Sequence, residues 1–347
     1  MPIHYESEIR ETRILNPLNS FQLTTQKLEH RTDPLTGHKV IVSKGRIDYV
    51  KRFIESDQNF INELVQTTQA TCPFCPDAVE KNAPKFPREM APEGRLRVGE
   101  AVCFPSLFAH EDFNALVVPT KQHLVQLNEF TPELLVNGFR ACLMYFDKVS
   151  TTFPDAKYPA IIMNFLPPAG STIAHPHIQA LVSYSPVQEV GDLLSASQSY
   201  ATTNGTKYWN DLIETERRLG MRYVGNLDGV HWITPFAPMG LNESQGIIPA
   251  SSLETLSDKD LIGLADGFSR VLKYYHDIGV RSFNAAIYSG PMHERSEQFN
   301  MIARIVSRYG YKAKFVSDVW ALQYLLGEQE VYESPEETCM KLKQYFK

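Results

Sequence analysis

A short polar row marks the part of the chain best suited to chemistry: His175, His177 and Gln179 alternate with Pro176 and Ile178. In an extended segment alternate side chains share a face, so the three polar groups project together. A fixed imidazole at His177 can act as a nucleophile toward a phosphate, and Gln179 can hydrogen-bond phosphoryl oxygens without titrating. The row therefore predicts a phosphoryl-transfer site. The alternative is a pair of satisfied histidines on a surface strand.

The residues around the row must hold it in place. It follows the turn Gly170-Ser171-Thr172, whose backbone and hydroxyl donors can form an anion-binding concavity. It leads into the apolar run Ala180-Leu181-Val182. Because Pro176 has no N–H group, we expect an edge strand, or a strand that turns this position toward a ligand or solvent.

A second motif, Cys72-Pro73-Phe74-Cys75, brings two thiols together in a tight knuckle. Two thiolates at this spacing can hold one metal ion. A thioredoxin-type redox pair would have a strand before it and a helix after it, and the flanking residues predict neither. We therefore favour a metal site over a redox pair, with two unpaired thiols as the remaining alternative.

A closed zinc site needs four ligands, and histidines of the same half of the chain can supply the other two. His175 is one candidate and His123 is the other, with His110 as the alternative to His123. A metal ion on His175 would fix the end of the row and so position His177.

Positive charge for a phosphate is predicted just after a short strand at 39–43. There Lys44 and Arg46 flank Gly45, which allows a close backbone approach. Either cation could neutralise phosphate charge, which does much of the work in phosphoryl transfer. A solvated hairpin end is the alternative interpretation.

The chain then repeats one order of elements: strand, helix, strand, strand. The first copy is predicted at 115–119, 131–149, 160–164 and the histidine row, and the second at 246–249, 257–279, 283–288 and 300–306. This order predicts an internal duplication and an α+β fold of two halves, 1–195 and 207–347, joined by a polar link at about 198–206. In our alignment His175 lies on Phe299, His177 on Met301, Gln179 on Ala303 and His123 on Leu253. We expect an active first half and a supporting second half that lends Arg304 or the C-terminal tail to the substrate pocket.

Composition limits the classes of partner. The 347 residues are 43% hydrophobic and 21% charged, with a net charge of −6 and no basic run. A nucleic acid or an anionic membrane is therefore not expected, whereas a small anion bound by a few local cations is compatible. No apolar stretch reaches the roughly 20 residues that span a bilayer, and the start lacks a signal pattern, so we expect a cytoplasmic protein. Five cysteines do not form a disulfide framework.

Together these motifs resemble the galactose-1-phosphate uridylyltransferase family of the histidine-triad superfamily. The resemblance rests on segments in the family's order over nearly the whole chain: 31–37, Val42-Ser43, Arg46, Cys72-Pro73-Phe74-Cys75, Asn164, Gly170 and 175–179. It implies two similar halves, each a sheet with helices, usually paired as a homodimer.

The resemblance also implies a ping-pong mechanism, in which the residue matching His177 becomes nucleotidylated by a nucleoside diphosphate sugar and a phosphorylated acceptor then takes the nucleotide. It implies that Gln179 contacts the phosphate, and that structural zinc is held by Cys72, Cys75, His123 and His175. The substrate-binding residues that we predict are Arg46, Ser106, Phe108, Asn164, Gly170, Ser171, Thr172, Lys314 and Phe315.

Three departures from the family pattern bear on the substrate. Ser106-Leu107-Phe108 replaces the Asn-Asp-Phe of uridylyltransferases and is closer to the Asn-Leu-Tyr of plant ADP-glucose phosphorylases. After Lys314-Phe315, Val319-Trp320 replaces a Tyr-Glu pair, and Ile178 replaces a glycine. The second-half metal histidines of the family are absent, so no second metal is expected. A phosphorylase that uses inorganic phosphate, and a nucleotide-binding zinc protein without turnover, are the alternatives.

Overall fold

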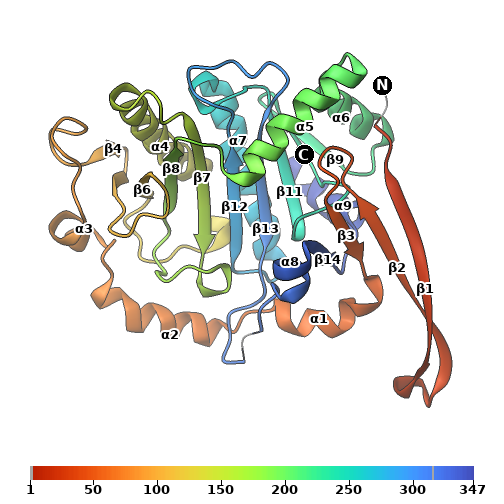
Figure 1. The fold of residues 1–347 in the computed structure, drawn as a ribbon. Helices are drawn as coiled ribbons and strands as arrows, with labels where there is room; N and C mark the ends of the chain where they lie inside the picture. Colours follow the sequence, from red (N-terminus) through yellow and green to blue (C-terminus); the bar gives the residue numbers. More distant parts are fainter. Residues whose placement is uncertain (1–2, 315) are drawn as a thin grey trace.

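The computed structural model, which describes residues 3–314 and 316–347, is built around one ten-stranded antiparallel sheet (Figure 1). Its first five strands come from the first half of the chain and the other five from the second half. In spatial order they are β4 (Leu96–Val98), β5 (Ala101–Pro105), β6 (Phe113–Val118), β8 (Ile178–Ser183), β7 (Tyr158–Phe165), β12 (Phe283–Tyr288), β13 (Met301–Ser307), β11 (Leu241–Ile248), β10 (Val230–Ile233) and β9 (Tyr223–Leu227).

The order of the strands confirms the duplication. Read outward from the centre, β7-β8-β6-β5-β4 in one half matches β12-β13-β11-β10-β9 in the other. The halves meet where β7 pairs with β12, so the two expected sheets are one continuous sheet. One long helix of each half, α4 (Pro132–Thr152) and α7 (Asp258–Asp277), packs on the same face, and the caps Thr131 and Ser257 start them as predicted.

Our alignment of the two halves was wrong by one residue. Ile178 and Ala180 of β8 belong to the core under the helices, as do Ala303 and Ile305 of β13. Gln179 faces away from the helices, and its counterpart is therefore Arg304. A shift of one residue moves every side chain of a strand to the other face, and the run Met301–Ser307 is too apolar to show this from its sequence.

The ladders agree with the corrected alignment. Gln179 pairs with Leu116 of β6, and Arg304 pairs with Gln245 of β11. On the same basis His175 corresponds to Asn300 and His177 to Ile302.

His123 has no counterpart in the second half. It lies in the connection from β6 to the long helix, which runs from Val118 to Gln126. The corresponding connection of the second half, from Ile247 to Ser252, is shorter. Leu253, on which we had placed His123, instead starts the 3₁₀ turn that corresponds to the turn at Leu127.

A second sheet of four strands lies beside the first: β1 (Glu6–Asn16), β2 (Gln22–Thr32), β3 (Lys39–Val42) and β14 (Glu328–Val331). β1 and β2 form a long hairpin that extends away from the body (Figure 1). We had expected residues 1–30 to be irregular. Their side chains mix charge and apolar groups without alternation, because nearly all of β1 is exposed and neither face joins a core.

The remaining helices surround these sheets. They are α1 (Ile47–Ile54), α2 (Gln58–Thr68), α3 (Pro76–Asn82), α5 (Gln188–Asn204), α6 (Tyr208–Leu219), α8 (Ala321–Leu326) and α9 (Pro335–Leu342). The link expected at 198–206 is therefore mostly helical, within α5. The division into 1–195 and 207–347 stays a proposal. Across the described ranges, none of the helices combines the length and the apolarity that a bilayer crossing requires.

Candidate functional site

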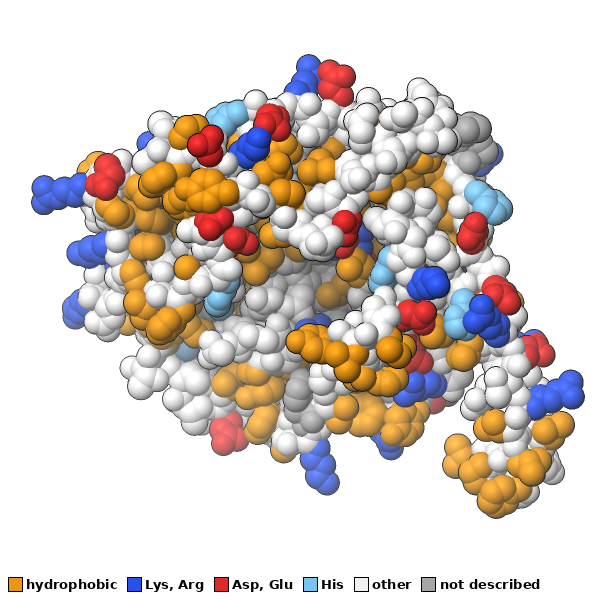
Figure 2. All heavy atoms as spheres, in the orientation of Figure 1, with side chains coloured by type: hydrophobic (Ala, Val, Ile, Leu, Met, Phe, Trp, Pro, Cys, Tyr) orange, Lys and Arg blue, Asp and Glu red, His pale blue; other side chains and the backbone are white. Residues whose placement is uncertain are grey.

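The polar row lies on the sheet face opposite α4 and α7, and this side of the molecule is hollowed at its centre (Figure 2). β8 is an interior strand between β6 and β7, which excludes the edge strand, the first of our two alternatives for Pro176. Because β8 begins only at Ile178, Pro176 lies before the ladder and removes no hydrogen bond from it.

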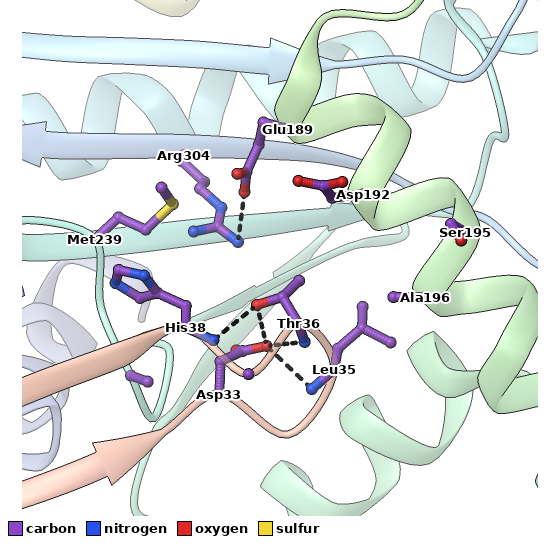
Figure 3. Close-up of a pocket in the computed structure, with 12 residues that line it drawn as sticks. Asp33, Leu35, Thr36, His38, Glu189, Asp192, Ser195, Ala196, Met239 and Arg304 are labelled. Atoms are coloured by element: carbon purple, nitrogen blue, oxygen red, sulfur yellow. Dashed lines mark hydrogen bonds and ion pairs between the residues drawn. The ribbon is translucent and has the colours of Figure 1, made fainter. Parts of the chain in front are cut away.

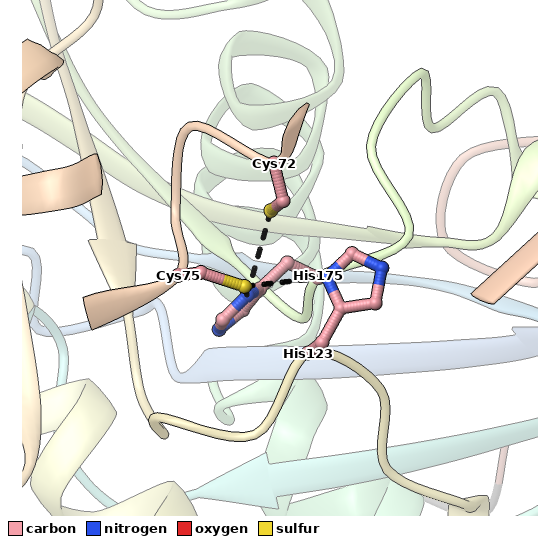
Figure 4. A group of neighbouring side chains, drawn as sticks. All are labelled: Cys72, Cys75, His123 and His175. Carbon is pink, nitrogen blue, oxygen red and sulfur yellow. Dashed lines mark hydrogen bonds between the residues drawn. The ribbon is translucent and has the colours of Figure 1, made fainter. Parts of the chain in front are cut away.

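Four predicted ligands come together in one cluster (Figure 4). The ligand atoms of Cys72, Cys75, His123 and His175 all lie within 4.8 Å of one another. His175 Nδ1 is 3.7 Å from Cys72 Sγ and 3.8 Å from Cys75 Sγ, and His123 Nδ1 is 3.6 Å from Cys75 Sγ. A tetrahedral zinc ion would set sulfur and nitrogen ligands roughly 3.5 Å apart, so the donor set and its size fit this metal.

The second nitrogen of each imidazole is held in place. His175 Nε2 is 2.9 Å from the carbonyl oxygen of Thr120, and His123 Nε2 is 3.0 Å from Thr68 Oγ1. Such partners fix the ring orientation so that Nδ1 faces the ion. Burial lowers the pKa of His175 to about 4 and also lowers the pKa of His123, which favours the neutral rings that bind metals.

His110, the alternative fourth ligand, is exposed and lies outside the cluster. A helix, α3, does follow Cys75, contrary to our expectation. No strand precedes Cys72, because α2 and a 3₁₀ turn lead into it. The presence of two histidines beside the thiols is the observation that favours a metal over a redox pair.

His177 has one committed nitrogen and one open nitrogen. Its Nδ1 is 3.0 Å from the carbonyl oxygen of His175, so Nδ1–H donates there and Nε2 carries the free lone pair. Phe74, from the cysteine knuckle, packs edge-on against the ring at 5.3 Å between centroids. Burial lowers the pKa of His177, which keeps the ring neutral. Two residues on, Gln179 Oε1 is buried without a hydrogen-bond partner among the described residues.

The turn before the row is less open than we expected. The amide groups of Gly170 and Ser171 donate to Pro167 and Leu166, and the Ser171 hydroxyl donates to the carbonyl oxygen of Ile173 at 2.7 Å. Only Thr172, which is exposed, keeps its donors for a ligand within the part of the chain that the structure describes. Leu166 has a positive φ of 68°, a strained conformation for this residue type.

Asn164, a predicted substrate-binding residue, is held by residues that our sequence reasoning missed. Asn284 Nδ2 donates to Asn164 Oδ1 at 2.6 Å, and Arg308 Nη1 donates to Asn284 Oδ1 at 2.6 Å. Asp318 in turn accepts from Arg308 Nε at 2.8 and 2.9 Å. An asparagine inside the otherwise apolar strand 283–288 was the one signal that could have revealed this network.

The predicted phosphate cations have partners in the C-terminal segment. Arg46 donates to both oxygens of Glu330 at 2.8 and 2.9 Å and lies over the ring of Tyr332. Lys44 pairs with Glu337 at 3.0 Å. The Arg46 side chain is still 48% exposed, so part of its guanidinium faces solvent.

Of the other predicted substrate-binding residues, those that the structure describes are partly or fully exposed. Ser106 Oγ donates to the carbonyl oxygen of Phe108 at 2.9 Å, and the Phe108 side chain is exposed. Lys314 is also exposed, and Phe315 lies outside the described residues.

Arg304 lines a cavity of about 470 Å³ between α5, β13 and the turn before β3 (Figure 3). Its guanidinium lies 3.8 Å from Glu189 and 3.6 Å from the buried carboxylate of Glu243. Burial raises the pKa of Glu243 to about 7, although Arg304 opposes this. Among the described residues, none of the predicted substrate-binding residues lines this cavity. A contribution of Arg304 or the C-terminal tail to the substrate pocket stays a prediction.

Known proteins are similar to this chain in sequence and in fold. No model of a protein family matches the chain. An uncharacterized protein from Archaeoglobus fulgidus is 29% identical over 337 residues, which cover 96% of this chain and 97% of that protein.

Solved structures are similar over nearly the whole chain. An ADP-glucose phosphorylase from Arabidopsis thaliana with bound ADP-glucose has a TM-score of 0.70 at 18% identity, over 92% of this chain and 99% of that one. A GalT-like protein from Arabidopsis thaliana has 0.68 at 16% identity, over 91% and 98%. A uridylyltransferase has 0.66 at 18% identity, over 91% and 98%. The chain thus has the fold of the galactose-1-phosphate uridylyltransferase-like proteins, as its motifs implied.

Proposed function

We propose that the chain is a nucleotidyltransferase that moves a nucleoside monophosphate through a covalent intermediate on His177. The observation that carries the proposal is the state of this imidazole, whose Nδ1 is bound to the His175 carbonyl while Nε2 stays open. A neutral imidazole fixed in this way is a ready nucleophile.

In the first step Nε2 of His177 attacks the phosphorus atom next to the nucleoside. The P–N bond forms as the P–O bond to the sugar phosphate breaks, and the sugar phosphate leaves with the electron pair. We expect Gln179 and Thr172 to hydrogen-bond the phosphoryl oxygens, with Asn164 as a further donor. In the second step a phosphate oxygen of the acceptor attacks the same phosphorus, and the P–N bond breaks to regenerate His177.

We also propose that Cys72, Cys75, His123 and His175 hold a structural zinc ion. The ion supplies no step of the reaction and fixes the position of His175, from whose carbonyl oxygen His177 is oriented.

A second candidate is an ADP-sugar phosphorylase, in which inorganic phosphate is the acceptor. Ser106-Leu107-Phe108 favours it, because this segment is closer to the pattern of plant ADP-glucose phosphorylases. The solved ADP-glucose phosphorylase with the same fold is compatible with this substrate but does not decide it.

Intact mass of the protein after incubation with one donor at a time tests the proposal. UDP-glucose, ADP-glucose and a GDP-sugar are offered without an acceptor, and we expect a gain of one nucleoside monophosphate that is lost in acid. Adding glucose 1-phosphate or inorganic phosphate to the adduct should then discharge it, and the acceptor that does so separates transferase from phosphorylase.

The matched variants are His177→Gly, which should form no adduct, and His110→Gly, which replaces an exposed histidine and should react like the wild type. Tight donor binding without an adduct in the wild type would overturn the proposal in favour of a nucleotide-binding zinc protein. From the resemblance we further propose a homodimer in the cytoplasm. Sedimentation analysis tests the dimer.

A further inference from the structure

A second row of polar side chains, distinct from the histidine row, crosses the junction between the halves on the open face of the sheet. Asn164 of β7 lies directly opposite Asn284 of β12. On its other side β7 pairs with β8 as far as Ile162 and Gln179, where the ladder ends. Continued by two residues, the same register would set Asn164 opposite His177. Asn284 is therefore the second-half residue next in line to the reacting imidazole.

The hydrogen bonds of this row have a fixed direction. Asp318 can only accept and Arg308 can only donate, so Arg308 must donate to the oxygen of Asn284. This leaves Asn284 Nδ2 to donate to Asn164 Oδ1 at 2.6 Å. Asn164 must then turn its own Nδ2 away from Asn284, as a free donor.

The same amide group also holds the turn that precedes the histidines. Asn284 Nδ2 donates a second hydrogen bond, of 2.9 Å, to the carbonyl oxygen of Ala169. Ala169 lies between the strained Leu166 and Gly170, whose φ of 85° suits glycine. Strain of this kind persists only where neighbouring contacts hold it.

The Asp318–Arg308 pair is itself well protected. The side chains of Arg308 and Asp318 are 15% and 8% exposed. An ion pair with three charge-assisted hydrogen bonds and little solvent around it is geometrically specific.

We propose that Asn284 is a positioning residue, which sets Asn164 with its N–H donor toward the phosphate at His177, and that Arg308 and Asp318 set Asn284. The proposal rests on the nucleotidyl transfer proposed above. In this proposal the second half determines the orientation of the Asn164 amide group in the first half.

Asn284→Asp tests this with almost no change of shape. Aspartate keeps a partner for Arg308 but can no longer donate, so Asn164 should turn and present its oxygen to the phosphate. We expect the rate of nucleotidyl-His177 formation, followed by rapid quench and intact mass, to fall about a hundredfold. The fall should be in the rate at saturating donor, with a smaller change in KM. The loss of the hydrogen bond to Ala169 should lower the midpoint of thermal unfolding by a few degrees at most.

Two further variants separate positioning from a merely structural role. If Asn284 acts through Asn164, then Asn164→Ala should lower the rate as well, and Asn284→Asp should add little to it in the double variant. Additive losses would overturn the proposal. Asn242→Asp is the matched control, because Asn242 donates to Ser307 on the same sheet outside the row, and it should react like the wild type.

Asp318→Asn offers an independent arm should Asn284→Asp fail to fold. It loosens Arg308 without touching Asn284, and we expect a rate about tenfold lower. An Asn284→Asp or Asp318→Asn protein that forms the adduct at the wild-type rate would overturn the positioning role and leave the proposed function intact. A wild type that forms no adduct with any donor would overturn the proposed function, and the inference with it.

Discussion

β8 and β13 occupy equivalent places in the two halves, yet only β8 is led by reactive groups. His175, His177 and Gln179 correspond to Asn300, Ile302 and Arg304. In the first half this face meets the cysteine knuckle, and in the second half it meets α5, where Arg304 lies near Glu189. The two halves therefore share their strand order and differ in the side chains on the open face of the sheet.

The largest effect is expected when His177 is replaced by isoleucine, the residue at the corresponding position of the second half. His177→Ile should abolish the adduct and lower turnover at least about a thousandfold, because the nucleophile is gone. The wild type should carry no more than one nucleotide per chain, since Ile302 replaces the histidine in the second half. Two adducts per chain in the intact mass would contradict this contrast between the halves.

The cysteine knuckle has no counterpart in the second half, so its loss should affect the first half selectively. Cys75→Ser should lower the zinc content from about one ion per chain to near zero and reduce the midpoint of thermal unfolding by several degrees. Cys339→Ala, a buried cysteine of the second half, is the control and should keep its zinc. Metal analysis of both purified variants decides, and equal zinc content would exclude the site.

Helix packing against the sheet also differs between the halves. A Cβ on Gly267 would lie about 2.1 Å from the ring of the buried Trp232, whereas one on Gly138 would meet the flexible end of Ile178 at 2.7 Å and Pro119 Cβ at 3.3 Å. We expect Gly267→Ala to lower the free energy of unfolding by about 2–3 kcal/mol. Gly138→Ala should change it by less than about 1 kcal/mol, since alanine also favours the helix. Urea unfolding of the two variants measures the difference, and equal losses would contradict it.

The smallest expected effect concerns Glu243, which is buried beside Arg304 with Glu189 and Asp33 nearby. Its folded pKa of about 7 lies above the ordinary value, so the folded state binds the proton more tightly than the unfolded state. Its contribution to stability is therefore complete below about pH 4.5 and is lost as the pH rises through 7. Glu243→Gln should reduce the fall in unfolding free energy between pH 5 and 8 by about 2 kcal/mol. An unchanged pH profile would show that Glu243 does not titrate in this range.

Much of the fold was predictable, because apolar periodicity and the caps Thr131 and Ser257 indicate the duplicated order of elements. The register of β13 was not, because a strand that is buried on both faces carries no alternation. The hairpin of β1 and β2 was missed for the opposite reason, since its side chains serve no core.

The candidate site divides in the same way. Cys72, Cys75 and His175 could be named from residue type and spacing, with His123 and His110 as alternatives for the fourth ligand. The structure brings His123 together with the other three. Asn284 stands out as a polar residue in its apolar strand, but its contact with Asn164 could not be predicted. The two residues meet only through a strand pairing between positions 120 apart in the chain. Contacts that depend on which strands become neighbours are not visible in local sequence.

Because β7 pairs with β12, each half depends on the other to complete the sheet. Either half produced alone would expose an apolar strand edge, which is β7 in the first half and β12 in the second. Such an edge can pair with another molecule and lead to aggregation. A change that unfolds the second half would therefore inactivate the first without touching any reactive group. The second half is therefore needed for the fold of the first, whether or not it contributes a group to the proposed reaction.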